Sequence, residues 1–63
     1  MPLAENLKSF RDKRGLTQQD LAAAAETTRE TVALIEIGKR RPSWKLLARL
    51  AAALGTTESK LIA

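Results

Sequence analysis

The chain has 63 residues, carries a net charge of +4, and contains neither cysteine nor histidine. The length predicts one small domain over residues 1–63, which leaves no room for a second domain that senses a metabolite. Without cysteine there are no disulfides or thiolate metal sites, and without histidine the commonest general base and zinc ligand are missing. We therefore expect no catalytic residue, cofactor, metal or small-molecule ligand, and no enzymatic activity.

The positive charge is concentrated in the second half of the chain. Residues 1–36 hold five basic and six acidic residues, whereas residues 37–57 hold five basic residues and no acidic one. Such a patch suits a polyanion such as nucleic acid, or an anionic membrane surface, and a solvated face is the alternative. No apolar run approaches the roughly 18 residues of a membrane span, and no secretory signal is evident. We expect a cytoplasmic protein with no membrane partner.

The first helix is predicted over about residues 2–14. Leu3, Leu7 and Phe10 repeat at the spacing of one helical face, and Gly15 follows as a C-terminal cap. This pattern indicates an amphipathic helix that packs on a core.

Two further helices, joined by a tight turn, are predicted over about residues 17–25 and 28–36. Threonines stand where each helix should begin, Thr17 for the first and Thr27 or Thr28 for the second. The expected inward-facing residues are apolar: Leu21, Ala22, Ala25, Val32 and Ile35. A helix, a turn of three or four residues and a second helix is the layout of a DNA-reading helix-turn-helix.

A basic loop separates this pair from the last two helices. The loop is Lys39-Arg40-Arg41-Pro42, because the residue before a proline is steered away from helical angles. Ser43 is expected to cap a fourth helix over about residues 44–54, and Thr57 a short last helix. The fourth helix should bury its regularly spaced apolar residues, which are Trp44, Leu47, Leu50, Ala51 and Leu54. The expected fold is all-α, a compact five-helix domain.

These residues resemble the helix-turn-helix DNA-binding domain of phage repressors and Cro-type regulators, the XRE family. The matching segments are R-G-L-T-Q-Q-D-L-A, T-T-R-E-T-V-A-L-I-E-I-G-K-R-R-P-S and L-A-R-L-A-A-A-L-G-T-T, in the family's order and spacing. The resemblance covers nearly the whole chain and implies a repressor-like fold. One departure is Glu26, which stands in the turn where the family usually has glycine; a positive φ there costs a non-glycine residue roughly 1 kcal/mol.

The resemblance implies that the third helix lies in the DNA major groove. Its first two residues, Arg29 and Glu30, and one a turn later, Ala33 or Leu34, are the expected base contacts. Arg29 can donate to guanine, Glu30 can accept from cytosine, and Leu34 can touch a thymine methyl group. Alternatively, Arg29 is a solvated surface residue and Leu34 a core or dimer contact. Glu30 could instead form a capping box with Thr27.

Contacts to the DNA backbone are expected from the start of the second helix, the cap of the third helix and the basic loop. The residues are Thr17, Gln18, Gln19, Thr28, Lys39, Arg40 and Arg41. A helix N-terminus attracts a phosphate through its free N–H groups, and arginines can follow the backbone or enter a narrow minor groove. The alternatives are an exposed polar surface and a charge run that keeps the protein soluble.

The resemblance also implies a buried ion pair between Arg11 and Glu36, which ties the first helix to the end of the third. Two separate surface charges are the alternative. Phe10 and Trp44 are expected in the core, whereas Ile37 is harder to place there.

The leading function is sequence-specific binding of double-stranded DNA by a transcriptional regulator, a repressor, acting as a homodimer on a two-fold symmetric site. A nucleoid-associated location would follow. The alternative is a protein-interaction module on the same fold, such as an antitoxin or a transcriptional cofactor, contacting protein through Leu34 and Ile37.

Overall fold

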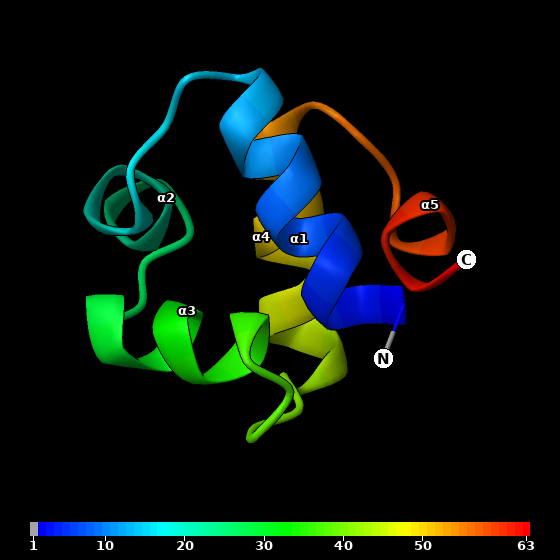
Figure 1. Ribbon diagram of the computed structural model, residues 1–63. Coiled ribbons are helices and arrows are strands. Elements are labelled where there is room, and N and C mark those ends of the chain that lie inside the picture. The colour runs from blue at the N-terminus through cyan, green and yellow to red at the C-terminus, as the bar shows by residue number, and fades with distance from the viewer. Residues whose placement is uncertain (1) are drawn as a thin grey trace.

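The computed structural model describes residues 2–63, and over these residues the chain forms five helices and no strand. The helices are α1 Pro2–Lys13, α2 Gln18–Ala24, α3 Arg29–Glu36, α4 Trp44–Leu54 and α5 Glu58–Ile62. The expected all-α, five-helix fold is confirmed, and α3 lies along one edge of the molecule with the loop that follows it (Figure 1). Over the described residues no helix is long and apolar enough to cross a membrane.

Four helices begin at a hydroxyl residue that accepts a hydrogen bond from the backbone N–H three residues later. These caps are Thr17, Thr28, Ser43 and Thr57. Because caps lie just outside the helices, α2 and α3 begin one residue later than the predicted ranges. The cap of α3 is Thr28, so the alternative in which Glu30 forms a capping box with Thr27 is wrong.

Four helices end in the same left-handed turn. The residue with positive φ is Gly15, Glu26, Gly38 or Gly55. In each turn the N–H of this residue and the N–H of the next donate to carbonyl oxygens three and five residues earlier, which is the Schellman arrangement. Glu26, which stands where the family usually has glycine, has a φ of 59° and therefore carries the cost of a positive φ.

The core forms where the helices meet, with α1 packed on α3 and α5, and α4 packed on α2 and α5. Its largest fully buried side chains are Leu7, Leu21, Val32, Ile35, Leu50, Leu54 and Leu61. Phe10 packs against this core and is partly buried. Trp44 does not belong to it, because 68% of this residue is exposed. Side chains of a helix point toward its N-terminus, so the first residue of α4 projects beyond the core.

Candidate nucleic-acid interface

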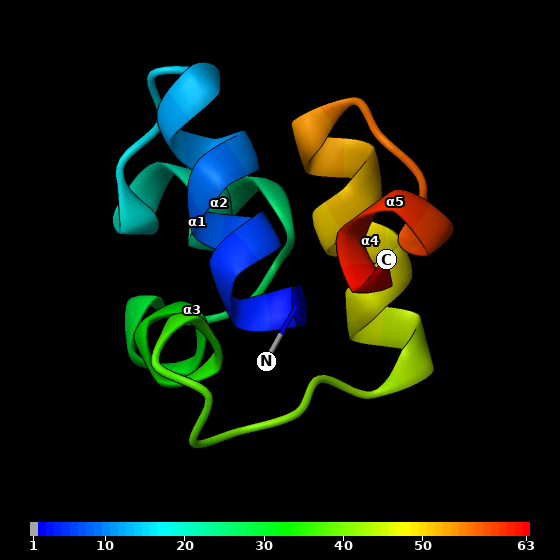
Figure 2. The same cartoon turned by 45° about the vertical axis from the view of Figure 1, so that its right-hand side comes forward.

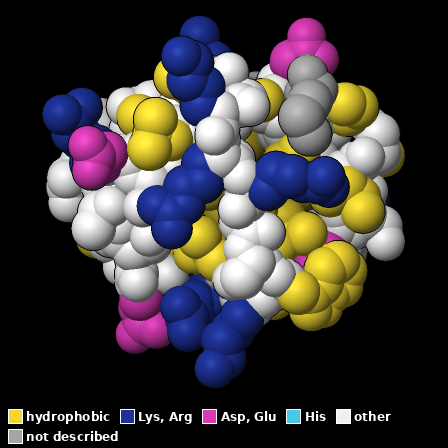
Figure 3. All heavy atoms as spheres, turned by 90° about the horizontal axis from the view of Figure 1, so that it is seen from below, with side chains coloured by type: hydrophobic (Ala, Val, Ile, Leu, Met, Phe, Trp, Pro, Cys, Tyr) yellow, Lys and Arg dark blue, Asp and Glu magenta, His cyan; other side chains and the backbone are white. Residues whose placement is uncertain are grey.

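The start of α3 is exposed on one face of the molecule. Arg29 and Glu30, the first two residues of α3, are both exposed, whereas Ala33 and Leu34 one turn later are partly buried. Figure 3 shows this face from below, with several Lys and Arg side chains spread across it and apolar side chains exposed between them. The geometry therefore brings two charged, solvent-facing side chains to the N-terminal end of α3.

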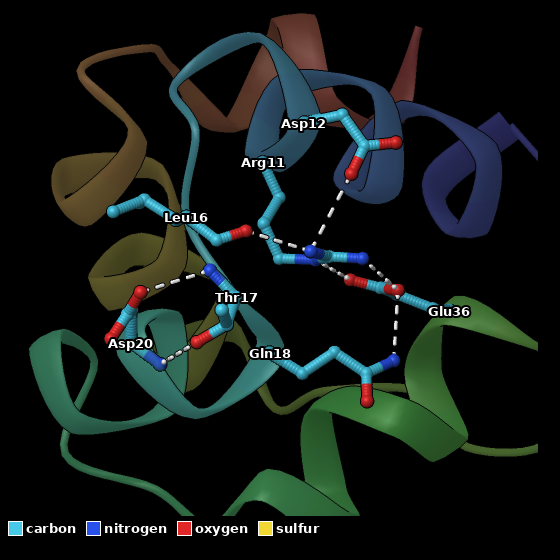
Figure 4. A network of polar contacts seen from close by, with 7 residues as sticks. All are labelled: Arg11, Asp12, Leu16, Thr17, Gln18, Asp20 and Glu36. Carbon is cyan, nitrogen blue, oxygen red and sulfur yellow. Dashed lines mark hydrogen bonds and ion pairs between the residues drawn. The ribbon is translucent and has the colours of Figure 1, made fainter.

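A buried polar network fixes the other end of α3. Arg11 Nε donates to Glu36 Oε2 at 2.6 Å and Arg11 Nη2 to Glu36 Oε1 at 3.1 Å, so the structure contains the ion pair that the resemblance implies. Only 11% of the Arg11 side chain and 4% of the Glu36 side chain are exposed. Arg11 Nη1 also donates to the carbonyl oxygen of Leu16 at 2.7 Å, which holds the segment before α2 (Figure 4). The hydrogen bond with Glu36 raises the pKa of Arg11 above its ordinary value, so the guanidinium stays charged.

Gln18 is part of the same network. Its Nε2 donates to Glu36 Oε1 at 3.1 Å, and its side chain is partly buried (Figure 4). A primary amide has two N–H groups, so one remains for a ligand. Gln19 is exposed. Thr17 is also exposed, but its N–H donates to Asp20 Oδ2 and its hydroxyl accepts from the Asp20 N–H in a capping box.

The basic loop reaches back to the cap of α3. Arg40 Nη1 donates to Thr31 Oγ1 at 3.3 Å, and the same oxygen accepts from the Thr28 hydroxyl at 2.9 Å. Thr31 is buried, and sequence reasoning missed it, although it lies three residues after its cap, a spacing that allows this contact. Lys39 and Arg41 are exposed, and within residues 2–63 their side chains form no hydrogen bond or ion pair.

The loop runs along the same side of the molecule as α3 before it enters α4 (Figure 2). Two large, exposed apolar residues flank the loop in the sequence. Ile37 at the end of α3 is 65% exposed, and Trp44 at the start of α4 is 68% exposed. Within residues 2–63 no group of three or more acidic residues could hold a metal ion.

A helix ended by a tight left-handed turn and followed by a second helix with an exposed start defines a helix-turn-helix domain. Residues 2–61 match the model of a family described as a helix-turn-helix domain. The chain belongs to this family, and the resemblance found in the sequence is confirmed.

The relatives include transcriptional regulators. The HTH-type transcriptional regulator DdrOP3 of Deinococcus deserti is 36% identical over 62 residues, which cover 98% of this chain and 48% of the relative. The restriction-modification controller protein C.AhdI of Aeromonas hydrophila has a crystal structure that matches with a TM-score of 0.92 at 30% identity, over 95% of this chain and 91% of that one. The chain spans between 48% and 64% of the length of the first curated relatives it matches.

The same fold also occurs within an enzyme. Hydroxypropylphosphonic acid epoxidase of S. wedmorenis matches with a TM-score of 0.87 at 34% identity, over 95% of this chain but only 32% of the epoxidase. Two thirds of that enzyme therefore lie outside the matched region.

Proposed function

We propose that this protein is a sequence-specific DNA-binding transcriptional regulator, a repressor that covers a promoter, and that α3 binds in the DNA major groove. The observation that carries the proposal is the exposed start of α3, with Arg29 and Glu30 at its first two positions, on a helix held in place at both ends. Membership of the helix-turn-helix family supports it, because the relatives include transcriptional regulators.

The base contacts follow from the side chains at the start of α3. Arg29 donates two hydrogen bonds to guanine O6 and N7, and Glu30 accepts from a cytosine amino group. Both side chains are free to do so, since neither takes part in the cap of α3. Ala33 and Leu34 lie one turn later, where an apolar surface can contact a thymine methyl group.

The phosphate contacts flank this helix. Lys39, Arg40 and Arg41 bind the backbone on one side, and Gln18 and Gln19 bind it on the other. Contacts of this kind position the protein on the duplex without reading its sequence. Thr17 and Thr28 can add backbone contacts, but the Asp20 carboxylate beside Thr17 repels a phosphate, so we place the main contact at the two glutamines.

Several finer points belong to the same proposal. The protein acts as a homodimer on half-sites about 34–36 Å apart, the spacing set by one turn of DNA. It works in the cytoplasm on the nucleoid, as one domain over residues 1–63, and it catalyses no reaction.

A second candidate is a protein-interaction module on the same fold. Ile37, the C-cap of α3, favours it, because this large apolar residue is 65% exposed close to the partly buried Leu34, and an exposed apolar surface can mark a protein interface.

Selection of duplexes from a randomised pool tests the proposal. Retained duplexes should share a symmetric sequence, and contacts with about four to six phosphates give a log–log salt slope near −4 to −5. If no duplex is retained at low salt, the DNA-binding proposal fails and the interaction module gains support.

Arginine variants then locate the interface. Arg29→Ala should weaken binding about tenfold and relax the preference for one base pair. The C-terminal end of α1 lies on the opposite side of the molecule from α3 (Figure 1), and Arg14 directly follows it. The Arg14 guanidinium lies beside Gly55 at the end of α4, so Arg14→Ala is the matched control and should bind as the wild type does.

A further inference from the structure

Trp44 is a large aromatic residue that the fold leaves in water. It is 68% exposed, it is the only tryptophan in the chain, and the chain has no tyrosine. Its backbone forms the first residue of α4, behind the cap Ser43, so the core would not have to change for the side chain to contact a ligand. An exposed apolar ring of this size indicates a contact surface more often than an isolated leucine does.

The basic residues that flank Trp44 in the sequence restrict which partner can cover its side chain. Residues 37–57 contain five basic residues and no acidic one, and Lys45 directly follows Trp44. A second copy of the chain docked on the same surface would bring two such basic segments together, and their like charges would repel each other. The fitting occupant is therefore a polyanion that also offers apolar surface.

The position of Trp44 relative to α3 points to the same occupant. Residues 37–43 alone separate the end of α3 from Trp44, and the connecting loop runs along the side of the molecule on which α3 lies (Figures 1 and 2). The major groove is only about 12 Å wide, so a helix inserted in it has a sugar–phosphate strand on each side. Trp44 is the first residue of α4, and α4 begins on the side of the molecule along which α3 and the loop run (Figures 1 and 2), where one of these strands would pass.

We propose that Trp44 binds the sugar–phosphate backbone of duplex DNA beside the groove that α3 occupies. The indole ring packs on deoxyribose C–H groups, the indole N–H donates to a phosphate oxygen, and Lys45 pairs with the same strand. This inference rests on the proposed DNA binding and adds a contact that does not depend on base sequence. It also gives a role to a residue that periodicity assigned to the core.

The single tryptophan makes the contact observable in the unmodified protein. We titrate the protein with a fluorescein-labelled duplex obtained by selection and record duplex anisotropy and Trp44 emission in parallel. The emission should change and saturate in step with the anisotropy.

Substitutions separate the contact from the fold. Trp44→Ala should weaken binding about threefold to tenfold for both selected and unrelated duplexes, as expected when part of an apolar ring is no longer withdrawn from water. Its unfolding temperature should stay within the error of the wild-type value, because the ring is outside the core. Ile62 is the matched control, since it is also large, apolar and exposed but lies on α5, and Ile62→Ala should bind DNA normally.

Four other results would each contradict the Trp44 contact, and each points to a different explanation. If the anisotropy reports binding while Trp44 emission is unchanged and Trp44→Ala binds normally, the Trp44 contact is wrong and the proposed function stands. If no duplex binds at all, both fail. If the emission changes with protein concentration without DNA, the surface pairs with a second copy. If polyglutamate changes the emission as much as the duplex does, the surface binds an acidic protein.

Discussion

The turn after α2 and the turn after α3 have the same backbone path but different residues at the left-handed position. Glu26 has a φ of 59° and Gly38 a φ of 79°. In the first turn the Thr27 N–H donates to the Ala22 carbonyl oxygen at 2.9 Å, and in the second the corresponding bond, from Lys39 to Leu34, is also 2.9 Å. The hydrogen bonds of the helix end thus define the turn, while glycine only lowers its conformational cost.

The two turns also differ in the side-chain contacts of the residues in and next to them. Glu36, just before the second turn, forms two buried hydrogen bonds with Arg11, whereas the carboxylate of Glu26 is exposed and lies 3.9 Å from Arg49. The strained residue therefore lies in the turn inside the helix-turn-helix, where packing of α2 on α3 holds it in place. The end of α3 is held instead by buried polar bonds, and we expect larger effects there.

The largest effect is expected from Glu36→Gln. The substitution keeps the shape of the side chain but removes the buried countercharge of Arg11, which leaves only the exposed Asp12 carboxylate 3.5 Å from Arg11 Nη1. Loss of one partner of a buried ion pair costs about 3–5 kcal/mol. A domain of this size has a total stability of only about 3–9 kcal/mol, so the variant should be near the limit of folding. Urea denaturation followed by circular dichroism measures the loss. Glu30→Gln, an exposed change on the same helix, is the control, and equal midpoints for the two variants would contradict the ion-pair argument.

Gly38→Ala should destabilise the protein by about 1 kcal/mol. No atom lies within 4 Å of the Cβ that this change adds, so the whole cost comes from the positive φ. Thermal unfolding measures it. The comparison with Gly55→Ala is informative, because there the new Cβ lies 2.8 Å from Arg14 Nη1 and the arginine end must also move. An unchanged melting temperature for Gly38→Ala would show that the turn tolerates a side chain without strain.

Glu26→Gly is the reverse experiment and should raise the free energy of unfolding by up to about 1 kcal/mol. The gain is partly offset because the pair with Arg49 is lost, but an exposed pair of this kind contributes only about 0–1 kcal/mol. Glu26→Ala removes the same charge and keeps the unfavourable φ, so it isolates the contribution of Arg49. If Glu26→Gly is no more stable than Glu26→Ala, the left-handed conformation carries no measurable strain.

Local patterns predicted most of this architecture, and contacts between distant segments account for what they missed. Apolar spacing and hydroxyl caps act within one or two turns, so they identified the helices and the caps Thr17, Ser43 and Thr57. Periodicity also assigned Trp44 to the core, and this prediction was wrong, since Trp44 is exposed. The spacing of apolar residues along one helix does not reveal where the helices that face it end. Thr31 was missed because its partner Arg40 comes from a separate loop, and the bond from Gln18 to Glu36 was missed for the same reason.

The smallest effect is expected at the start of α2, the end of that helix opposite to its strained turn. The backbone N–H and hydroxyl of Thr17 hold the pKa of Asp20 below its ordinary value of 3.8. Because the pKa of Asp20 is lower in the folded state, this stabilisation is fully present above the unfolded-state pKa. It is lost as the pH falls through the folded-state pKa, which lies below 3.8.

Asp20→Asn keeps the oxygen that accepts from Thr17 but cannot titrate. The wild type should therefore be the more stable protein at about pH 6, and the difference should shrink toward about pH 2.5. Urea midpoints of both proteins at the two pH values measure it, and a difference that is independent of pH would show that the capping box does not depend on the charge of Asp20.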